Sequence, residues 1–495
     1  MIKRIKHIVE LTLGVLIFVL VSWGVVGQPQ IYTAGKKFYG VNPLFNMSEI
    51  RNESSLNVEV IEDWHKVDGE VPTRQKLINI NVGELWSGQE YRIPVRMIVP
   101  TGSKAKGFHL TGGHWSKQIE SDAKLKPFEN DLIAGGVGLV YTVVQNMSAP
   151  PEQKELGDKM YSRFVKTLNP RYSIQYWAWP ATIMRAITAA YAENEFFDKG
   201  KVAVSGGSKN GASPSVAIIN DERITAQHAT ISPIYDSPLR LCDSSAWNIL
   251  KKENEVYAET VPFRKLFQGG TFGPVYNDAA LEAGHSMEDI QQLALQLADF
   301  IFISRNLGKL EQRGVDLLFE PGTHDCVAYD VPWGGEHFPQ IPIYLKVNSG
   351  HGHGKDNHQA VEKDQANKPA FLLGHFFKDM EPMLEPPILD YKVKKDKLNV
   401  RVRFKSGSKE ESGRIWWMYN RHPDGSAKYL EELFPDDQWL EMEYNSKDEA
   451  WTAEIELPKD VSHIDFFSNH KKILQRLSTK YPTYISSPYT RVRLN

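Results

Sequence analysis

The stretch Val-Ala-Val-Ser-Gly-Gly-Ser-Lys-Asn-Gly, residues 202–211, joins an apolar run to a run that favours a helix. The apolar part is typical of a buried strand, and Ser208 follows it between small residues. A tight strand-to-helix turn of this kind lifts a nucleophilic side chain above the edge of a sheet. The match to Gly-x-Ser-x-Gly is incomplete, because Asn210 stands at the last position and Gly211 follows it. A serine that only caps the helix is the alternative interpretation.

A serine nucleophile needs a base to take its proton and an acid to orient that base. In α/β-hydrolases these residues follow in the order Ser, Asp or Glu, His, each after a strand. Residues 315–325 read as a short strand that opens into a Gly-Thr loop with Asp325, and residues 341–352 read as a strand ending at His351. We therefore predict Asp325 as the orienting acid and His351 as the general base, with Glu320 or Asp330 as alternatives to Asp325.

The histidines around residue 351 raise a second possibility, a metal site. His351 is followed by His353 and His358, which gives a His-x-His pair. No carboxylate or cysteine spacing completes a recognisable set of ligands. We therefore expect neither a metal nor a cofactor.

An oxyanion hole is expected from the loop after an upstream strand. Residues 107–115 read as a strand that runs into Gly112-Gly113, and glycines let backbone N–H groups approach an oxyanion closely. The second donor would be the N–H of Lys209, whose ammonium group could add positive charge nearby. A purely structural turn at Gly112-Gly113 is the alternative.

Length and composition exclude some classes of protein. The chain has 495 residues, 41% of them hydrophobic and 24% charged, which predicts more than one domain and a globular fold. A net charge of −3 with no basic stripe gives no reason to expect a nucleic-acid partner. The two cysteines, Cys242 and Cys326, could form a disulfide or remain two separate thiols.

The N-terminus has the features of a targeting segment. Lys3, Arg4 and Lys6 precede an apolar run that ends near residue 26, with small residues before Gln28. We expect residues 1–27 to be a signal peptide or, since the run approaches the length of a membrane span, an uncleaved anchor. Either role predicts a secreted or periplasmic body that contacts a membrane only through this segment.

The rest of the chain divides into three parts. Residues 28–75 look loop-rich, residues 76–385 alternate strands and helices, and residues 386–495 carry short strands at regular spacing. We predict an α/β-hydrolase domain with a mostly parallel sheet covered by helices on both faces, and a C-terminal immunoglobulin-like β-sandwich. The irregular residues 236–308 would form a cap that shapes the substrate pocket.

Individual elements are expected within these parts. Residues 77–86 and 90–100 read as a hairpin, 138–144 and 224–231 as strands, and 182–192 and 287–302 as helices. In the C-terminal part we expect strands at 393–404, 414–419, 439–444, 451–457 and 464–469.

These motifs resemble the PhoPQ-activated pathogenicity-related protein family within the α/β-hydrolases. The segment 206–211 is similar to that family's Gly-Ala-Ser-Lys-Arg-Gly elbow, and Val143-Val144-Gln145-Asn146 is similar to its Gln-Val-Pro-Asn element. The elbow is also similar to Gly-Cys-Ser-Arg-Asn-Gly of glucuronoyl esterases, with Asp-Glu-Arg-Ile at 221–224. The resemblance implies an exported hydrolase fold, with Lys209 at the position of a basic residue that helps hold the oxyanion.

The leading hypothesis is an exported serine esterase that works through an acyl-enzyme on a small-molecule or carbohydrate ester. A secreted binding or signalling protein that keeps the fold with little turnover is the alternative from another class. A serine peptidase is a further alternative, since a triad identifies the reaction type and not the substrate.

Overall fold

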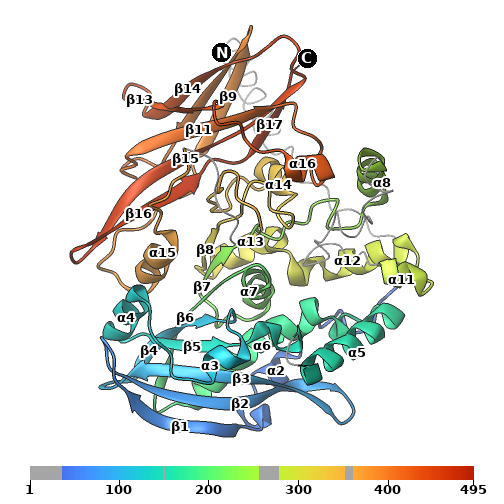
Figure 1. Cartoon of the computed structure of the whole chain (residues 1–495), viewed down its shortest axis with the longest axis vertical. Coiled ribbons are helices and arrows are strands. Elements are labelled where there is room, and N and C mark those ends of the chain that lie inside the picture. The colour runs from blue at the N-terminus through green and yellow to red at the C-terminus, as the bar shows by residue number, and fades with distance from the viewer. Residues whose placement is uncertain (1–35, 149–150, 256–277, 352–359, 495) are drawn as a thin grey trace, which may run out of the picture. The chain divides into compact units, whose positions relative to one another are not determined.

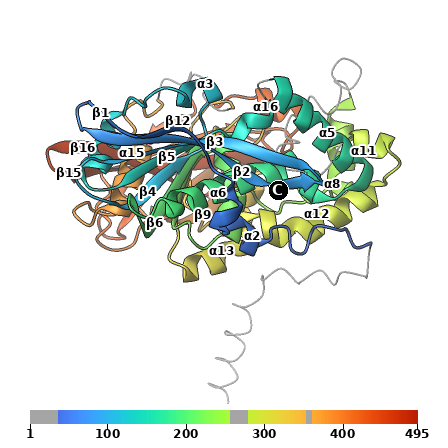
Figure 2. The same ribbon diagram turned by 90° about the horizontal axis from the view of Figure 1, so that it is seen from below.

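The strand that leads to Ser208 lies inside a mixed eight-stranded sheet (Figures 1 and 2). The structure is a computed structural model that describes residues 36–148, 151–255, 278–351 and 360–494. In spatial order the strands are β1 (Glu59–Val67), β2 (Thr73–Trp86), β3 (Gln89–Pro100), β5 (Gly138–Thr142), β4 (Ala105–Thr111), β6 (Phe197–Gly207), β7 (Ala226–Thr230) and β8 (Asp316–Phe319).

The sheet is parallel on one side and antiparallel on the other. Strands β5, β4, β6, β7 and β8 pair in parallel, whereas β1, β2 and β3 are antiparallel and β3 joins β5 antiparallel. This confirms the expected mostly parallel arrangement with an antiparallel edge. The predicted hairpin is confirmed as β2 and β3, although β2 begins four residues earlier than expected.

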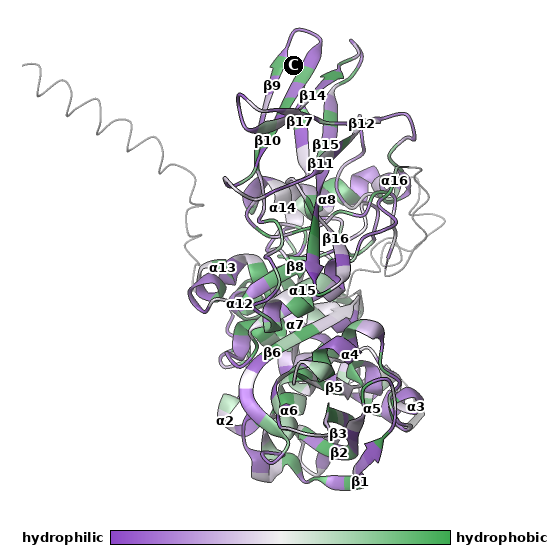
Figure 3. Ribbon diagram, turned by 90° about the vertical axis from the view of Figure 1, so that its left-hand side faces the viewer, coloured by the Kyte–Doolittle hydropathy of each residue, from purple (hydrophilic) through white to green (hydrophobic). Residues whose placement is uncertain are grey.

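Helices cover both faces of the sheet. Apolar residues of α6 and α7 pack with one face in the largest hydrophobic cluster, and residues of α4 and α15 pack with the other face. Figure 3 shows hydrophobic residues concentrated in the sheet and in helices beside it. The helices are α2 (Met47–Ile50), α3 (Ser116–Ile119), α4 (Pro127–Ala134), α5 (Pro151–Thr167), α6 (Trp179–Ala192), α7 (Lys209–Asn220), α8 (Ser244–Glu253), α11 (Asp278–Glu282), α12 (Met287–Ile301), α13 (Ile303–Gln312), α14 (Val331–His337), α15 (Asn367–Phe376) and α16 (Ala427–Glu431).

The segment expected to be loop-rich contains an edge strand. Strand β1 pairs with β2 along its length but leaves most of its side chains exposed or half-buried, including Val60 and Ile61. Backbone pairing therefore holds this strand without the alternation of buried and exposed residues that sequence patterns detect. Its register shifts are bulges, which are common at sheet edges.

Part of the segment expected as a cap packs into the body of the fold. Residues of α12 and α13 contact α7, and Ile290, Leu293 and Leu297 are buried in the main hydrophobic cluster. Residues 256–277 lie outside the described residues. The described part of this segment therefore contributes to the core beside the sheet.

The C-terminal part forms two separate antiparallel sheets. One has the order β13-β14-β10-β9, and the other has the order β12-β11-β15-β16 with β17 paired to β15. Side chains from both sheets, including Val400, Ile455 and Phe466, share a hydrophobic cluster. An immunoglobulin-like topology stays a prediction. The strands are β9 (Ile388–Lys394), β10 (Lys397–Arg403), β11 (Ser412–Tyr419), β12 (Trp439–Glu441), β13 (Glu443–Asn445), β14 (Ala450–Glu456), β15 (His463–Arg476), β16 (Thr479–Ser486) and β17 (Thr490–Arg493).

Two predicted strands have a different form in the structure. The expected strand 393–404 is a hairpin of β9 and β10, because Lys395 adopts a positive φ and turns the chain. The strand expected within 341–352 makes only single bridges in its described part, from Ile343 to Phe319 at the end of β8 and from Lys346 to Gly322 in the loop after it. Its next partner is Ser486, whose N–H donates to Ile343 O at 2.8 Å and whose Oγ accepts from Leu345 N at 2.7 Å.

The remaining expectations concern the termini and the cysteines. The targeting segment 1–27 lies outside the described residues, and within the described ranges no helix is both long and apolar enough to cross a membrane. Cys242 and Cys326 carry separate thiols, and no disulfide joins them.

Candidate active site

Ser208 sits at a strained turn between β6 and α7. Its φ is 52° and its ψ is −132°, a backbone conformation that residues other than glycine rarely adopt. A Cβ on Gly206 would lie 2.2 Å from Asn210 O, and one on Gly211 would lie 2.6 Å from Gly206 O. Gly206 and Gly211 therefore meet across the turn, which explains why the second glycine can stand one position later than in the usual pattern.

The structure brings Ser208, His351 and Asp325 into one hydrogen-bonded chain. Ser208 Oγ lies 2.7 Å from His351 Nε2, and His351 Nδ1 lies 2.8 Å from Asp325 Oδ1. The Asp325 side chain is 2% exposed, whereas that of His351 is 37% exposed. A buried carboxylate thus faces one ring nitrogen while the hydroxyl faces the other, which is the arrangement of a serine nucleophile with its base and acid.

The surroundings of His351 favour its protonated form. The hydrogen bond with Asp325 raises the pKa of His351 above 6.5, against burial and the positive charge of Lys209, which lower it. The buried Asp325 also accepts from Val327 N at 2.9 Å through the same Oδ1. The imidazole can therefore accept and hold a proton while the carboxylate stays fixed.

Lys209 begins the helix that follows Ser208. As the first residue of α7 its N–H has no intrahelical acceptor, so it points out of the helix start near Ser208. Its side chain lies over the Trp179 ring, with Nζ 5.8 Å from the ring centroid. Burial lowers the pKa of Lys209.

The two glycines predicted for an oxyanion hole differ in their surroundings. A Cβ on Gly113 would lie 3.7 Å from Asn210 Nδ2, so Gly113 is beside the first turn of α7. Its N–H makes a long hydrogen bond of 3.4 Å to Thr111 Oγ1. A Cβ on Gly112 would lie 2.2 Å from Val144 Cγ2, so Gly112 is required by packing. Gly113 therefore lies beside the helix start, and its N–H would have to leave Thr111 Oγ1 to reach an oxyanion.

The alternative acids have other partners. Burial alone would raise the pKa of Glu320, but His228 and Lys346 hold it at about 2, and His228 Nε2 lies 2.9 Å from Glu320 Oε1. Asp330 is ion-paired with Arg240. Asp325 is thus the carboxylate of the three that contacts His351.

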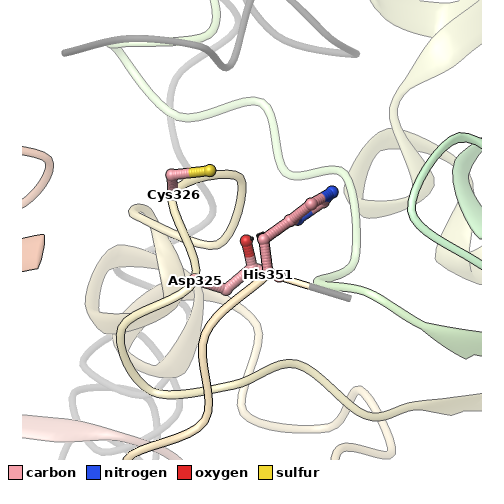
Figure 4. A group of neighbouring side chains, drawn as sticks. All are labelled: Asp325, Cys326 and His351. Atoms are coloured by element: carbon pink, nitrogen blue, oxygen red, sulfur yellow. Dashed lines mark hydrogen bonds and ion pairs between the residues drawn. The ribbon is translucent and has the colours of Figure 1, made fainter. Parts of the chain in front are cut away.

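Metal binding is a second function to consider for the side chains around His351. Ligand atoms of Asp325, Cys326 and His351 lie within 4.8 Å of one another, and Figure 4 shows the three side chains on two neighbouring loops. Both His351 nitrogens already have partners. Burial and the Asp325 carboxylate raise the pKa of Cys326 to about 11. His353 and His358 lie outside the described residues.

Several residues near the site were not predicted to have a role there. Asn210 is 7% exposed, and its Oδ1 has no hydrogen-bond partner among the described residues. Arg240 and Arg421 contact the loop that carries Asp325 from distant parts of the chain, and Asn348, in the loop that carries His351, contacts Thr323. Asn210 stands within the elbow motif, whereas the other three are single polar residues in loops that follow no period or motif, so no sequence pattern could have indicated them.

Comparisons with known proteins give weak likenesses. No family model and no curated protein matches the chain. Among solved structures, an acetyl xylan esterase from Thermoanaerobacterium is 13% identical over 64% of this chain and 90% of its own, with a TM-score of 0.34. A glucuronoyl esterase from Teredinibacter turnerae is 9% identical over 58% of this chain and 64% of its own, with a TM-score of 0.33.

A peptidase gives a likeness of the same strength. The acylaminoacyl peptidase of Pyrococcus horikoshii is 12% identical over 60% of this chain and 47% of its own, with a TM-score of 0.31. Because all three TM-scores are below 0.5, the function of this chain has to be inferred from its own site. The resemblance to the PhoPQ-activated family stays a prediction.

Proposed function

We propose that the chain is an exported serine hydrolase that acts as an esterase, with Ser208 as nucleophile. The observation that carries the proposal is the continuous hydrogen-bond chain from Ser208 Oγ through His351 to Asp325. It is supported by the positive φ of Ser208 at the start of α7, since strained residues of this kind concentrate at functional sites.

The reaction would proceed in two halves. Ser208 Oγ attacks the carbonyl carbon of the ester while its proton moves to His351 Nε2, and Asp325 stabilises the imidazolium. Backbone N–H groups of Lys209 and Gly113 would donate to the oxyanion. As the bond to the alcohol oxygen breaks, His351 gives the proton to the leaving alkoxide. Water then attacks the acyl-enzyme by the same route, which releases the acid and restores Ser208.

Labelling with a fluorophosphonate tests the proposal without knowledge of the substrate. The probe phosphonylates an activated serine, so we expect the folded wild-type chain to be labelled and Ser208→Ala to remain unlabelled. Absence of labelling of folded wild-type protein would contradict the proposal and favour a binding or signalling role.

The substrate can then be sought with a matched panel. A carbohydrate ester is our first candidate, because the elbow resembles that of glucuronoyl esterases. Methyl esters of sugar acids, acetylated sugars and p-nitrophenyl esters of increasing acyl length should be compared with the amides of the same acids. Faster cleavage of the amides would identify a peptidase.

Export is tested separately from catalysis. The targeting segment 1–27 predicts that the chain leaves the cytoplasm. Cell fractionation of the full chain and of a variant without these residues should find the activity outside the cytoplasm only for the full chain. Equal cytoplasmic retention of both would contradict export and leave the catalytic proposal unaffected.

A further inference from the structure

Two buried arginines from distant parts of the chain contact the backbone on either side of Asp325. Arg421, between β11 and α16, donates from Nη2 to Thr323 O at 2.8 Å. Arg240, between β7 and α8, donates from Nη2 to Val327 O at 2.7 Å. The two carbonyls lie two residues before and two residues after Asp325. Arg240 is 2% exposed and Arg421 is 1% exposed.

The contact of Arg240 reaches the carboxylate through one further hydrogen bond. Val327 N–H donates to Asp325 Oδ1 at 2.9 Å, and the same oxygen contacts His351 Nδ1 at 2.8 Å. A displaced Val327 peptide would therefore turn the carboxylate relative to the imidazole. Arg240 is itself held by Asp330, whose Oδ1 accepts from Arg240 Nη2 at 2.9 Å.

Arg421 holds the other side and connects it to the C-terminal sheets. Its Nη1 donates to Tyr489 Oη at 2.7 Å, and Tyr489 donates to Asp465 Oδ2 at 2.7 Å. Its guanidinium lies over the Tyr429 ring, 3.7 Å from the centroid. Because Asp465 belongs to β15, strands of the C-terminal part support the backbone next to the predicted acid.

The loop that carries His351 is tied to the same support. Asn348, with a positive φ of 54°, donates from Nδ2 to Phe434 O at 2.8 Å and accepts from Phe434 N at 2.7 Å. Its own N–H donates to Thr323 Oγ1 at 2.8 Å. Thr323 is also the residue whose carbonyl Arg421 holds. The two loops are thus joined to each other and to the C-terminal part.

We propose, on the basis of the function proposed above, that Arg240 and Arg421 are positioning residues that set Asp325 against His351. Neither touches the reacting atoms, so both act through the backbone of the Asp325 loop. A guanidinium suits this role, because its planar fork donates in fixed directions whereas a lysine ammonium does not.

The experiment compares three lysine variants. Arg421→Lys and Arg240→Lys keep the buried positive charge but lose the planar guanidinium, whose donors point in fixed directions. Arg185→Lys is the matched control, since Arg185 is 1% exposed and donates to the carbonyls of Asn81, Glu49, Ile50 and Asn52, away from the site. The rate constant of fluorophosphonate labelling and the kcat and KM for p-nitrophenyl acetate are measured against pH, with thermal unfolding recorded for each variant.

We expect the two site variants to lose about 100-fold in labelling rate and in kcat, because a small misplacement of a catalytic group has that cost. The acid limb of their pH profiles should move to lower pH, because a misplaced Asp325 raises the pKa of His351 less. Arg185→Lys should unfold at a lower temperature than the wild type, but its labelling rate, its kcat and the acid limb of its pH profile should be unchanged. Tyr489→Phe, which removes a partner of Arg421, gives the same readout if Arg421→Lys does not fold.

Two outcomes would overturn the proposal. The first is that folded Arg240→Lys and Arg421→Lys keep the wild-type labelling rate, kcat and acid limb. The second is that Arg185→Lys loses as much labelling rate and kcat as these two variants. The failure of the proposed function is distinguishable from both, because it requires that the folded wild-type chain is not labelled.

Discussion

Two hydrogen-bonded chains, each made of a hydroxyl, an imidazole and a carboxylate, lie at opposite ends of the parallel strands of the main sheet. We call these ends the carboxyl edge and the amino edge. At the carboxyl edge, Ser208 Oγ lies 2.7 Å from His351, which lies 2.8 Å from Asp325. At the amino edge, Thr225 Oγ1 lies 2.9 Å from His375 Nε2, whose Nδ1 lies 2.6 Å from Asp316 Oδ2. Distances alone therefore do not separate a candidate catalytic site from a structural contact.

The two sites differ in the surroundings of their hydroxyl groups. Thr225 Oγ1 also accepts from Val202 N and donates to Val202 O, both at 3.1 Å, so it is part of the backbone pairing between strands. Ser208 Oγ bonds to His351 alone among the described residues, and it stands in a strained turn at a helix start. The acids are reversed as well, since Asp316 is 57% exposed and Asp325 is 2% exposed. A nucleophile needs an uncommitted hydroxyl and a fixed, buried acid.

The largest contrast should come from removing each hydroxyl. We expect Ser208→Ala to lower kcat by about 10⁶-fold, as loss of a serine nucleophile does, and Thr225→Val to leave it within about twofold. The measurement is ester hydrolysis at saturating substrate, together with fluorophosphonate labelling. If Thr225→Val folded normally but was not labelled, the nucleophile would belong to the amino edge of the sheet, which would contradict the assignment of Ser208.

The acids offer the next contrast. Asp325→Asn should lower kcat by about 10⁴-fold, because the amide cannot hold the same tautomer of the base. In the wild type, the hydrogen bond with Asp325 raises the pKa of His351, so the imidazole loses its proton at higher pH than an ordinary histidine and activity should rise with pH through that titration. In Asp325→Asn this acid limb should fall to lower pH. Asp316→Asn should change neither the rate nor the limb, and pH-rate profiles of both variants check this.

The comparison also explains what the sequence could predict. Ser208, Asp325 and His351 each follow an apolar run, directly or after a short glycine-containing loop, so local pattern and chain order sufficed to select them, although their roles stay predictions. Thr225, His375 and Asp316 carry no such signal, and neither do Arg240 and Arg421, because each depends on a contact between residues far apart in the chain. Strand β1 was missed for a related reason, since its exposed side chains leave only backbone pairing to define it.

A smaller effect is expected from Lys209→Met, which removes the ammonium group and keeps the backbone N–H. Lys209→Met removes a cation that lowers the pKa of His351, so the acid limb should move to higher pH. The loss in kcat should be less than about tenfold, because the backbone N–H remains and loss of a whole oxyanion donor costs about 10²–10³. The measurement is kcat/KM across the acid limb. A limb that moves to lower pH would contradict this electrostatic effect of Lys209 on His351. A loss above 10²-fold would mean that the ammonium itself holds the substrate or the oxyanion.

The smallest change in activity, and a clear change in stability, is expected at the amino edge. Thr225→Val leaves His375 and the Val202 backbone without the hydroxyl that they share, while the backbone bond from Thr225 N to Val202 O at 2.8 Å remains. We expect the free energy of unfolding to fall by about 1–3 kcal/mol, which is the cost of leaving buried polar groups unsatisfied. Equilibrium denaturation measures this loss, and kcat/KM of the folded variant serves as its control. Unchanged stability would mean that water replaces the hydroxyl, and the contrast between the two edges would then rest on the acid and the strained turn alone.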